Sequence, residues 1–305
     1  MKEIKTVGIV GLGALGVLYA RQFTDALGPE QVRVLADAGR IARYRSEGVF
    51  FNDALCNFHY ADAALETQPP DLMLFAVKFG ALEQAIAQCR HLVGPDTTIL
   101  SVLNGISSEQ ILSAAFGPEK VVWCVAQKMS ALKEGNRAVC RVTGNLAVGV
   151  PAGQDPSRLQ ALRAFFDRIG FAYETPEDIR RHMWSKLLVN VGCNQSAMVH
   201  ECTYAGLQAP GRARNVMIGA MREVALVANA EGIPLSEEDV SHWTAVVDSL
   251  DPDSTPSMRQ DSKARRKSEV ELFAGTVRRL AQKHGIAVPV NDWLYEMIRE
   301  MESCY

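Results

Sequence analysis

The feature that most constrains this chain is a glycine-rich loop near its start. Residues 6–10 (TVGIV) form a short apolar run typical of a strand, and a helical pattern through Leu18 and Phe23 begins just after the loop. Between a strand and a helix, GxGxxG indicates a dinucleotide-binding turn, because its glycines permit the tight turn, the approach of a pyrophosphate and close helix–strand packing. We therefore expect NAD(P) to bind at Gly11, Leu12, Gly13, Ala14, Leu15 and Gly16.

Further strand-like runs predict a parallel sheet. Residues 31–36, 71–77 and 98–103 are nearly continuous apolar segments, and a helical stretch at 81–89 separates the last two. Such strands alternating with helices are typical of a sheet covered on both faces, which is an α/β Rossmann-type domain. More strand-like runs follow at 121–127, 146–150 and 171–174, with a helix expected at 159–169.

The residues after the second strand leave the cofactor open. Asp37 has the position of an acid that accepts hydrogen bonds from the adenosine ribose of NAD. Arg40 and Arg43 follow closely, and either suits the 2′-phosphate of NADP. Asp37 also fits an ordinary helix N-cap.

Polar residues follow two of the predicted strands. Lys78 comes after the run at 71–77, and Asn104-Gly105 comes after the run at 98–103. The carboxyl ends of parallel strands are where open α/β sheets bind ligands, so Lys78 and Asn104 are candidates for binding cofactor and substrate. Taken singly, they read as a surface lysine and a turn.

The second half of the chain reads as helical. A proline and two acids at 175–178 indicate a helix start, and helical patterns cover 179–199, 211–231, 236–248 and 259–284, with a last one after Pro289. We predict an NAD(P)-binding domain at 1–176 and an all-helical substrate domain at 177–305.

The first of these helices, at 184–194, carries an unusual polar stripe. Lys186, Asn190 and Asn194 recur every fourth residue and would share one face of an α-helix. The residues between them are mostly apolar, which predicts a buried helix whose stripe faces either water or a small polar substrate.

Composition limits the classes of function. The 305 residues are 48% hydrophobic and 22% charged with net charge −3, so nucleic-acid or membrane-surface binding is not expected. The run KARRK at 263–267 is flanked by acids and reads as a solvated helix face. Seven scattered cysteines without metal-ligand spacing predict reduced thiols, no metal site and a cytoplasmic protein without a signal peptide or membrane span.

Several ordered motifs resemble the ketopantoate reductases (2-dehydropantoate 2-reductases) over nearly the whole chain. They are GLGALG at 11–16, VK at 77–78, NG at 104–105, W-x-K-x-x-x-N-x-x-x-N at 184–194, P-S-M-x-Q-D at 256–261, Ser268-Glu269, and HGIAVPVN at 284–291. The resemblance implies a Rossmann domain followed by a helical domain like the C-terminal domain of 6-phosphogluconate dehydrogenase.

The resemblance also implies roles for single residues. Lys186 would be the general acid and Glu269 its neighbour, while Lys78 would lie near the nicotinamide and substrate. Asn104, Asn190, Asn194 and Ser257 would bind the substrate. The chemistry suits these types, because hydride addition places negative charge on a ketone oxygen, which an ammonium group stabilises and protonates. As lone residues, Glu269 and Ser257 read as a helix-face acid and an N-cap.

The resulting prediction is NADPH-dependent reduction of 2-dehydropantoate to (R)-pantoate in pantothenate and coenzyme A biosynthesis, with NADP favoured over NAD by the resemblance. The partner is a small 2-oxo acid, and a monomer or a homodimer is expected. Departures from the family pattern at Gln195-Ser196 and Gln127-Lys128 keep a different 2-oxo acid open as the substrate. A non-catalytic dinucleotide sensor is the remaining alternative.

Overall fold

The computed structural model describes residues 2–305, and the chain forms two compact units. The first unit contains the residues up to Leu103 together with Ser108–Ile179. The second contains Asn104–Ser107 and Arg180–Tyr305. The short segment Asn104–Ser107 therefore groups with the second unit although strand and helix of the first unit flank it in the chain.

A five-stranded sheet forms the centre of the first unit. Its strands are β1 (Val7–Val10), β2 (Val32–Ala36), β5 (His59–Asp62), β6 (Leu72–Phe75) and β7 (Thr98–Ser101). They lie in the order β5-β2-β1-β6-β7, and every neighbouring pair is parallel. This order, in which the chain winds outwards from β1 in both directions, confirms the predicted Rossmann-type fold.

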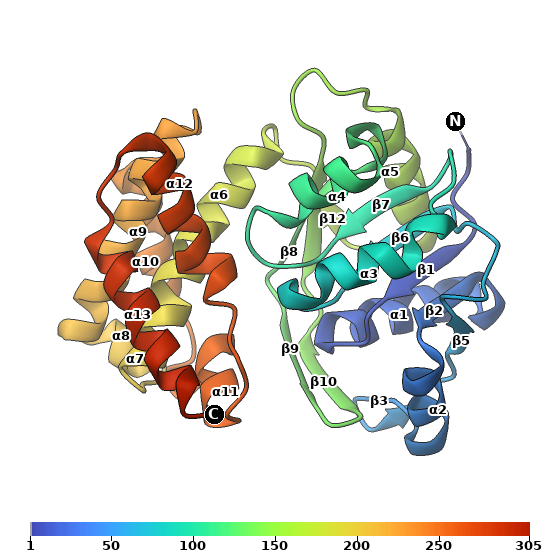
Figure 1. The fold of residues 1–305 in the computed structure, drawn as a ribbon, viewed down its shortest axis with the longest axis horizontal. Helices are drawn as coiled ribbons and strands as arrows, with labels where there is room; N and C mark the ends of the chain where they lie inside the picture. Colours follow the sequence, from blue (N-terminus) through green and yellow to red (C-terminus); the bar gives the residue numbers. More distant parts are fainter. Residues whose placement is uncertain (1) are drawn as a thin grey trace. The chain divides into compact units, whose positions relative to one another are not determined.

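Helices cover both faces of this sheet (Figure 1). In β6, Leu72 and Leu74 pack into a core with α1 (Ala14–Leu27) and α5 (Ser157–Ile169). Met73 and Phe75 pack into a second core with α3 (Leu82–Cys89) and α4 (Ser108–Phe116). Alternate residues thus face opposite helical layers, which explains why the strand is apolar throughout.

Two smaller sheets complete the first unit. One has the order β12-β11-β8, from β8 (Trp123–Gln127), β11 (Asn145–Gly149) and β12 (Tyr173–Glu174). The other has the order β4-β3-β10-β9, from β3 (Phe50–Phe51), β4 (Ala54–Leu55), β9 (Ser130–Glu134) and β10 (Arg137–Val142). The remaining elements are α2 (Ala38–Glu47) and four 3₁₀ turns: η1 (Pro29–Gln31), η2 (Phe79–Ala81), η3 (Arg90–Leu92) and η4 (Pro118–Lys120).

The second unit is helical, as predicted (Figure 1). Two π-helical turns, η5 (Asn190–Asn194) and η6 (Glu271–Gly275), interrupt its α-helices. The α-helices are α6 (Ile179–Val189), α7 (Gln195–Val199), α8 (Tyr204–Gln208), α9 (Arg212–Ala230), α10 (Glu237–Asp248), α11 (Ser257–Lys263), α12 (Thr276–His284) and α13 (Pro289–Ser303).

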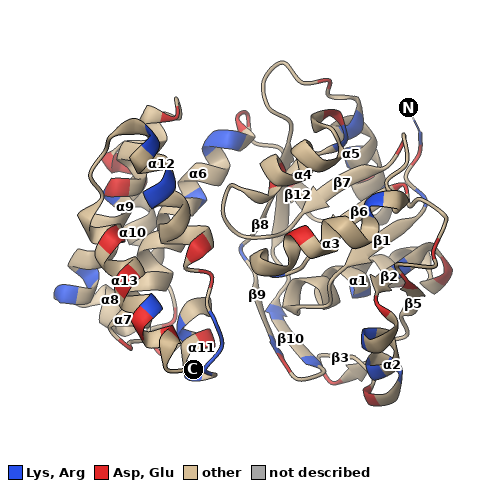
Figure 2. Ribbon diagram, in the orientation of Figure 1, with Lys and Arg blue, Asp and Glu red and all other residues tan. Residues whose placement is uncertain are grey.

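The single helix predicted over 259–284 is wrong. Helix α11 ends at Lys263, and Arg265 takes a left-handed φ of +50° before the chain turns. Glu302 accepts hydrogen bonds from the backbone N–H (2.7 Å) and the hydroxyl (2.5 Å) of Ser268, so a tertiary contact holds the chain out of the helix. The run KARRK is exposed, but past Lys263 it is not helical (Figure 2).

The helix start predicted at 175–178 is also displaced, since α6 begins at Ile179 and Pro176 lies outside it. Across residues 2–305, no helix combines the length and apolarity that crossing a membrane requires.

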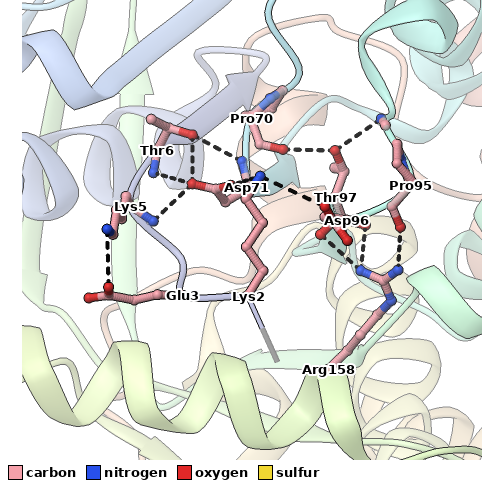
Figure 3. Close-up of polar contacts among 11 residues, drawn as sticks. Lys2, Glu3, Lys5, Thr6, Pro70, Asp71, Pro95, Asp96, Thr97 and Arg158 are labelled. Atoms are coloured by element: carbon pink, nitrogen blue, oxygen red, sulfur yellow. Dashed lines mark hydrogen bonds and ion pairs between the residues drawn. The ribbon is translucent and has the colours of Figure 1, made fainter.

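Asp71 fastens the start of the chain to the strand β6 (Figure 3). Its Oδ2 accepts hydrogen bonds from the backbone N–H groups of Lys5 and Thr6 and from the Thr6 hydroxyl, each at 3.0 Å. Lys2 Nζ lies 2.9 Å from its Oδ1. Burial alone would raise the pKa of Asp71, but the hydrogen bonds from Lys2, Lys5 and Thr6 outweigh burial and lower it below the ordinary 3.8.

Replacing Asp71 by Asn is expected to lower the free energy of unfolding by about 1–3 kcal/mol near neutral pH, because the amide is a weaker acceptor for these donors. A carboxyl whose folded-state pKa is lowered stabilises the fold above its unfolded pKa and loses that effect as pH falls through the folded value. Urea unfolding of both proteins from about pH 7 to about pH 2 should show the difference shrinking, mainly below about pH 4. The exposed neighbour Asp96, changed to Asn, is the control, and a pH-independent difference would contradict this account.

Candidate active site

The glycine loop has the geometry that its motif predicts. Gly11 has φ +97°, and a Cβ there would lie 2.7 Å from Val77 Cγ1. A Cβ on Gly16 would lie 2.0 Å from the Gly11 carbonyl oxygen, so this position packs the helix directly on the turn. Gly13 is exposed at the N-cap of α1, where a Cβ would meet only the Ala76 oxygen, at 3.6 Å. No side chain caps this helix start, so its N–H groups suit an anion such as a dinucleotide pyrophosphate.

Asp37 and Arg40 contact each other. Asp37 is the N-cap of α2, and its Oδ1 accepts a hydrogen bond of 2.8 Å from the Arg40 backbone N–H. Its Oδ2 lies 3.5 Å from Arg40 Nε. Asp37, which indicates NAD, and Arg40, which indicates NADP, therefore bind each other at the start of α2, just after β2.

The other candidate residues of the first unit lie after strand β6 and at the end of strand β8. Lys78 is exposed and is the N-cap of the 3₁₀ turn η2. Gln127 and Lys128 both bond Glu174, with 3.3 Å between Lys128 Nζ and Glu174 Oε2. Lys128 has a left-handed φ of +56°. The substrate-shaping role predicted for Gln127 and Lys128 stays a prediction.

Bonded serines hold the two ends of the segment that carries Asn104. Ser101, the last residue of β7, donates a 2.8 Å hydrogen bond from its hydroxyl to that of Ser108, the first residue of α4. Ser108 in turn donates to the Glu109 carboxyl at 2.9 Å. Complete burial raises the pKa of Glu109 to about 8, so this carboxyl favours its neutral form. At the tip, Gly105 has φ +86°, and a Cβ there would lie 2.8 Å from Leu272, so only glycine fits.

Asn104, Lys186 and Glu269 meet within the second unit. Lys186 Nζ donates to Asn104 Oδ1 at 3.5 Å, and Asn104 Nδ2 donates to Glu269 Oε2 at 3.2 Å. The amide thus turns its oxygen to the cation and its nitrogen to the carboxylate. All three side chains are partly buried. The structure therefore brings together a primary amine, an amide and a carboxylate that are far apart in the sequence.

The polar stripe predicted for the helix at 184–194 is only partly correct. Lys186 lies in α6, but residues 190–194 form the π turn η5, which has more residues per turn and shifts Asn194 off the face shared by Lys186 and Asn190. The prediction of burial is confirmed, since Leu187, Leu188, Val191 and Cys193 are all nearly inaccessible.

A second polar pair lies on the same turn. Asn194 is 9% exposed, and its Oδ1 accepts a 2.9 Å hydrogen bond from the Ser257 hydroxyl. Ser257 is exposed and is the first residue of α11, following the N-cap Pro256. Its hydroxyl therefore binds Asn194 and does not cap its own helix. The structure joins Asn194 with Ser257, and separately Lys186 with Asn104 and Glu269.

Comparison with known families agrees with this architecture, a Rossmann domain followed by a helical unit, as in two-domain oxidoreductases. Residues 7–153 match the family described as ketopantoate reductase PanE/ApbA, and residues 178–302 match its C-terminal part. The chain belongs to the ketopantoate reductase family and is an oxidoreductase of that family, which removes the sensor alternative.

Individual relatives are distant but cover nearly the whole chain. The 2-dehydropantoate 2-reductase of Aquifex aeolicus is 24% identical over 96% of both chains, and that of Shigella flexneri is 26% identical over 98% of this chain and 96% of its own. The solved 2-dehydropantoate 2-reductase of Geobacter metallireducens has TM-score 0.85 and 25% identity, covering 97% of this chain and 99% of that one. A D-mandelate dehydrogenase complex with NADH and anilino(oxo)acetate has the same fold, with TM-score 0.86 and 22% identity over 98% and 99% of the chains.

The glycine loop yields a direct test of its packing. Gly16→Ala should destabilise the protein by about 1–3 kcal/mol, because the new methyl group overlaps the Gly11 carbonyl. Gly13→Ala, where the added carbon makes an ordinary contact, should stay within about 1 kcal/mol of the wild type. Urea unfolding of both variants measures the difference, and equal effects at the two positions would refute this packing.

Proposed function

We propose that this protein is an NADPH-dependent reductase that converts 2-dehydropantoate to (R)-pantoate in pantothenate biosynthesis, with Lys186 as the general acid. The observation that carries the proposal is the contact chain Lys186–Asn104–Glu269. Family membership supports the same reaction, since the relatives named above are 2-dehydropantoate 2-reductases.

The chemistry of the contact chain suits reduction of a ketone. When bound, NADPH would supply a hydride to the carbonyl carbon, so that negative charge would develop on the carbonyl oxygen of the substrate. An ammonium group at Lys186 stabilises that charge and transfers its proton to the oxygen, giving the alcohol. The side-chain oxygen of Asn104 accepts a hydrogen bond from the Lys186 ammonium and so orients it. The Glu269 carboxylate accepts a hydrogen bond from the Asn104 side-chain nitrogen and so orients Asn104. Lys186 regains its proton from solvent.

Asn190, Asn194 and Ser257 supply neutral polar groups for the rest of the substrate. Amide N–H groups donate to a carboxylate, and hydroxyl groups both donate and accept, so they suit an acid that also carries a hydroxyl. Because these groups are uncharged, they do not compete with Lys186 for the developing negative charge. Their role as the substrate-binding set is part of the proposal.

NADPH is favoured over NADH by the pairing of Asp37 with Arg40. Both Asp37 oxygens already contact Arg40, one as an acceptor from its backbone and one near its guanidinium. That leaves Asp37 less free to bind a ribose hydroxyl, while the exposed Arg43 supplies further positive charge suited to a 2′-phosphate. In this proposal the glycine loop binds the pyrophosphate shared by both cofactors.

A second candidate is reduction of a different 2-oxo acid. Two observations favour it: the fold match to a D-mandelate dehydrogenase, and the departure from the family pattern at Gln127-Lys128. The reaction class would be the same, with a differently shaped acid.

A panel of oxo acids decides between these candidates. We expect 2-dehydropantoate to show the highest kcat/KM among branched and aromatic 2-oxo acids, with NADPH preferred to NADH by about tenfold or more. Oxidation of each cofactor is followed by absorbance. Turnover of another acid without turnover of 2-dehydropantoate would refute the named substrate and keep the reaction class.

The same assay tests the proton donor. Lys186→Met should lower kcat by about 10²–10⁴-fold, because the oxyanion loses its proton source, while NADPH binding stays close to that of the wild type. Lys263→Met, at the exposed end of α11, is the matched control and should keep full activity. Near-normal turnover of the Lys186 variant would rule out this residue as the acid.

A further inference from the structure

Two π-helical turns carry or adjoin the proposed catalytic and substrate-binding residues of the second unit. Asn190 and Asn194 are the first and last residues of η5, and Glu269 comes just before η6. A π turn changes the backbone hydrogen-bond register, so it leaves groups that the α-helix would have paired. Such buried groups need another partner.

At η6 the backbone N–H group that loses its carbonyl acceptor within the helix is that of Ala274. Phe273 N–H still donates to the Glu269 carbonyl, 3.1 Å away, in the α-helical pattern. Gly275 N–H donates to the Val270 carbonyl, 2.9 Å away, in the π-helical pattern. The Val270 carbonyl is the one that Ala274 would use in an α-helix. Ala274 N–H donates instead to Gln195 Oε1, 3.2 Å away.

At η5 the same side chain pairs a carbonyl. The backbone N–H of Gln195 donates to the Gly192 carbonyl, and not to Val191, its α-helical acceptor. Gln195 Nε2 donates to the Val191 carbonyl at 2.9 Å. Gln195 is completely buried, so water does not compete for these bonds. One amide therefore bonds both π turns, with its oxygen on η6 and its nitrogen on η5.

We propose that Gln195 is a positioning residue for the reaction proposed above: it locks η5 to η6 and thereby fixes Asn190 and Asn194 relative to Glu269. Gln195 itself does not touch the substrate. Errors of about 1 Å in such an arrangement can cost about a hundredfold in rate, so a buried amide that sets the register of both turns is tied to catalysis as well as to stability.

The neighbouring Ser196 offers a matched control. It is also completely buried, and its hydroxyl donates a 2.7 Å hydrogen bond to the Ala213 carbonyl of α9. Ser196 lies on the same helix α7, but this bond leads to α9 and not to η6. Removing it should cost stability without disturbing the link between the π turns.

The test compares Gln195→Met, which keeps the side-chain length without the amide, with Ser196→Ala. For Gln195→Met we expect kcat/KM for the oxo acid to fall by about 10- to 100-fold through both kcat and KM, with the dissociation constant of NADPH unchanged. Ser196→Ala should keep both kinetic constants. Wild-type kinetic constants in a folded Gln195→Met protein would overturn the proposal.

A second readout separates this proposal from the proposed function. Amide hydrogen exchange should rise in both 190–194 and 269–276 for Gln195→Met, and in neither segment for Ser196→Ala. Unchanged exchange in 269–276 would overturn the link, whatever the activity. If the wild type reduces no oxo acid, the proposed function fails, and with it the catalytic role of Gln195.

If Gln195→Met does not fold, Gln195→Glu replaces it, because this variant keeps the oxygen acceptor for Ala274. Gln195→Glu should show the loss in kcat/KM and faster amide exchange in 190–194. Wild-type kinetics together with wild-type exchange in this variant would overturn the proposal.

Discussion

The proposed active site depends on one amide side chain, Asn104. A primary amide accepts at one end and donates at the other, and here its oxygen faces the Lys186 ammonium while its nitrogen faces the Glu269 carboxylate. Asn104 needs the left-handed Gly105 beside it and the bonded serines at the ends of its segment. A segment of only a few residues thus extends from the Rossmann fold and groups with the helical unit.

The helical unit achieves its geometry by departing from regular helix. An uninterrupted α-helix from Ile179 to Val199 would put Asn194 on the same face as Lys186, whereas the π turn η5 places it in the buried contact with Ser257. Register changes of this kind leave backbone groups unpaired, and the Gln195 amide compensates for one at each of two such turns. Irregular backbone and buried polar side chains therefore occur together in this unit because each requires the other.

Much of the fold was readable from the sequence because its signals are local. Apolar runs predict β1, β2, β6 and β7, and the glycine spacing predicts the turn before α1. The sequence does not reveal the sheet containing β9 and β10, because these strands are largely exposed and lack an apolar run, with Leu132 and Val139 facing solvent. The break after Lys263 was missed because it depends on the distant Glu302.

The candidate site likewise has a part that the sequence predicts and a part that only the structure shows. Motifs in the sequence identify Asn104, Lys186 and Glu269 as candidates. The resemblance to the family supplies their expected roles. Their contacts come from tertiary structure, since 165 residues separate Asn104 from Glu269. Gln195 appears in the sequence only as a departure from a family pattern. Its two bonds depend on π turns, which have no periodicity signal of their own.

The most direct test of the central claim is the pH dependence of kcat/KM for the wild type and for Glu269→Gln. If Lys186 donates the proton, activity must fall at the alkaline pH where Lys186 becomes neutral. Removing the nearby carboxylate removes a charge that favours the ammonium form, so the account predicts that this fall moves to lower pH in Glu269→Gln. An alkaline fall at the same pH in both proteins would contradict it.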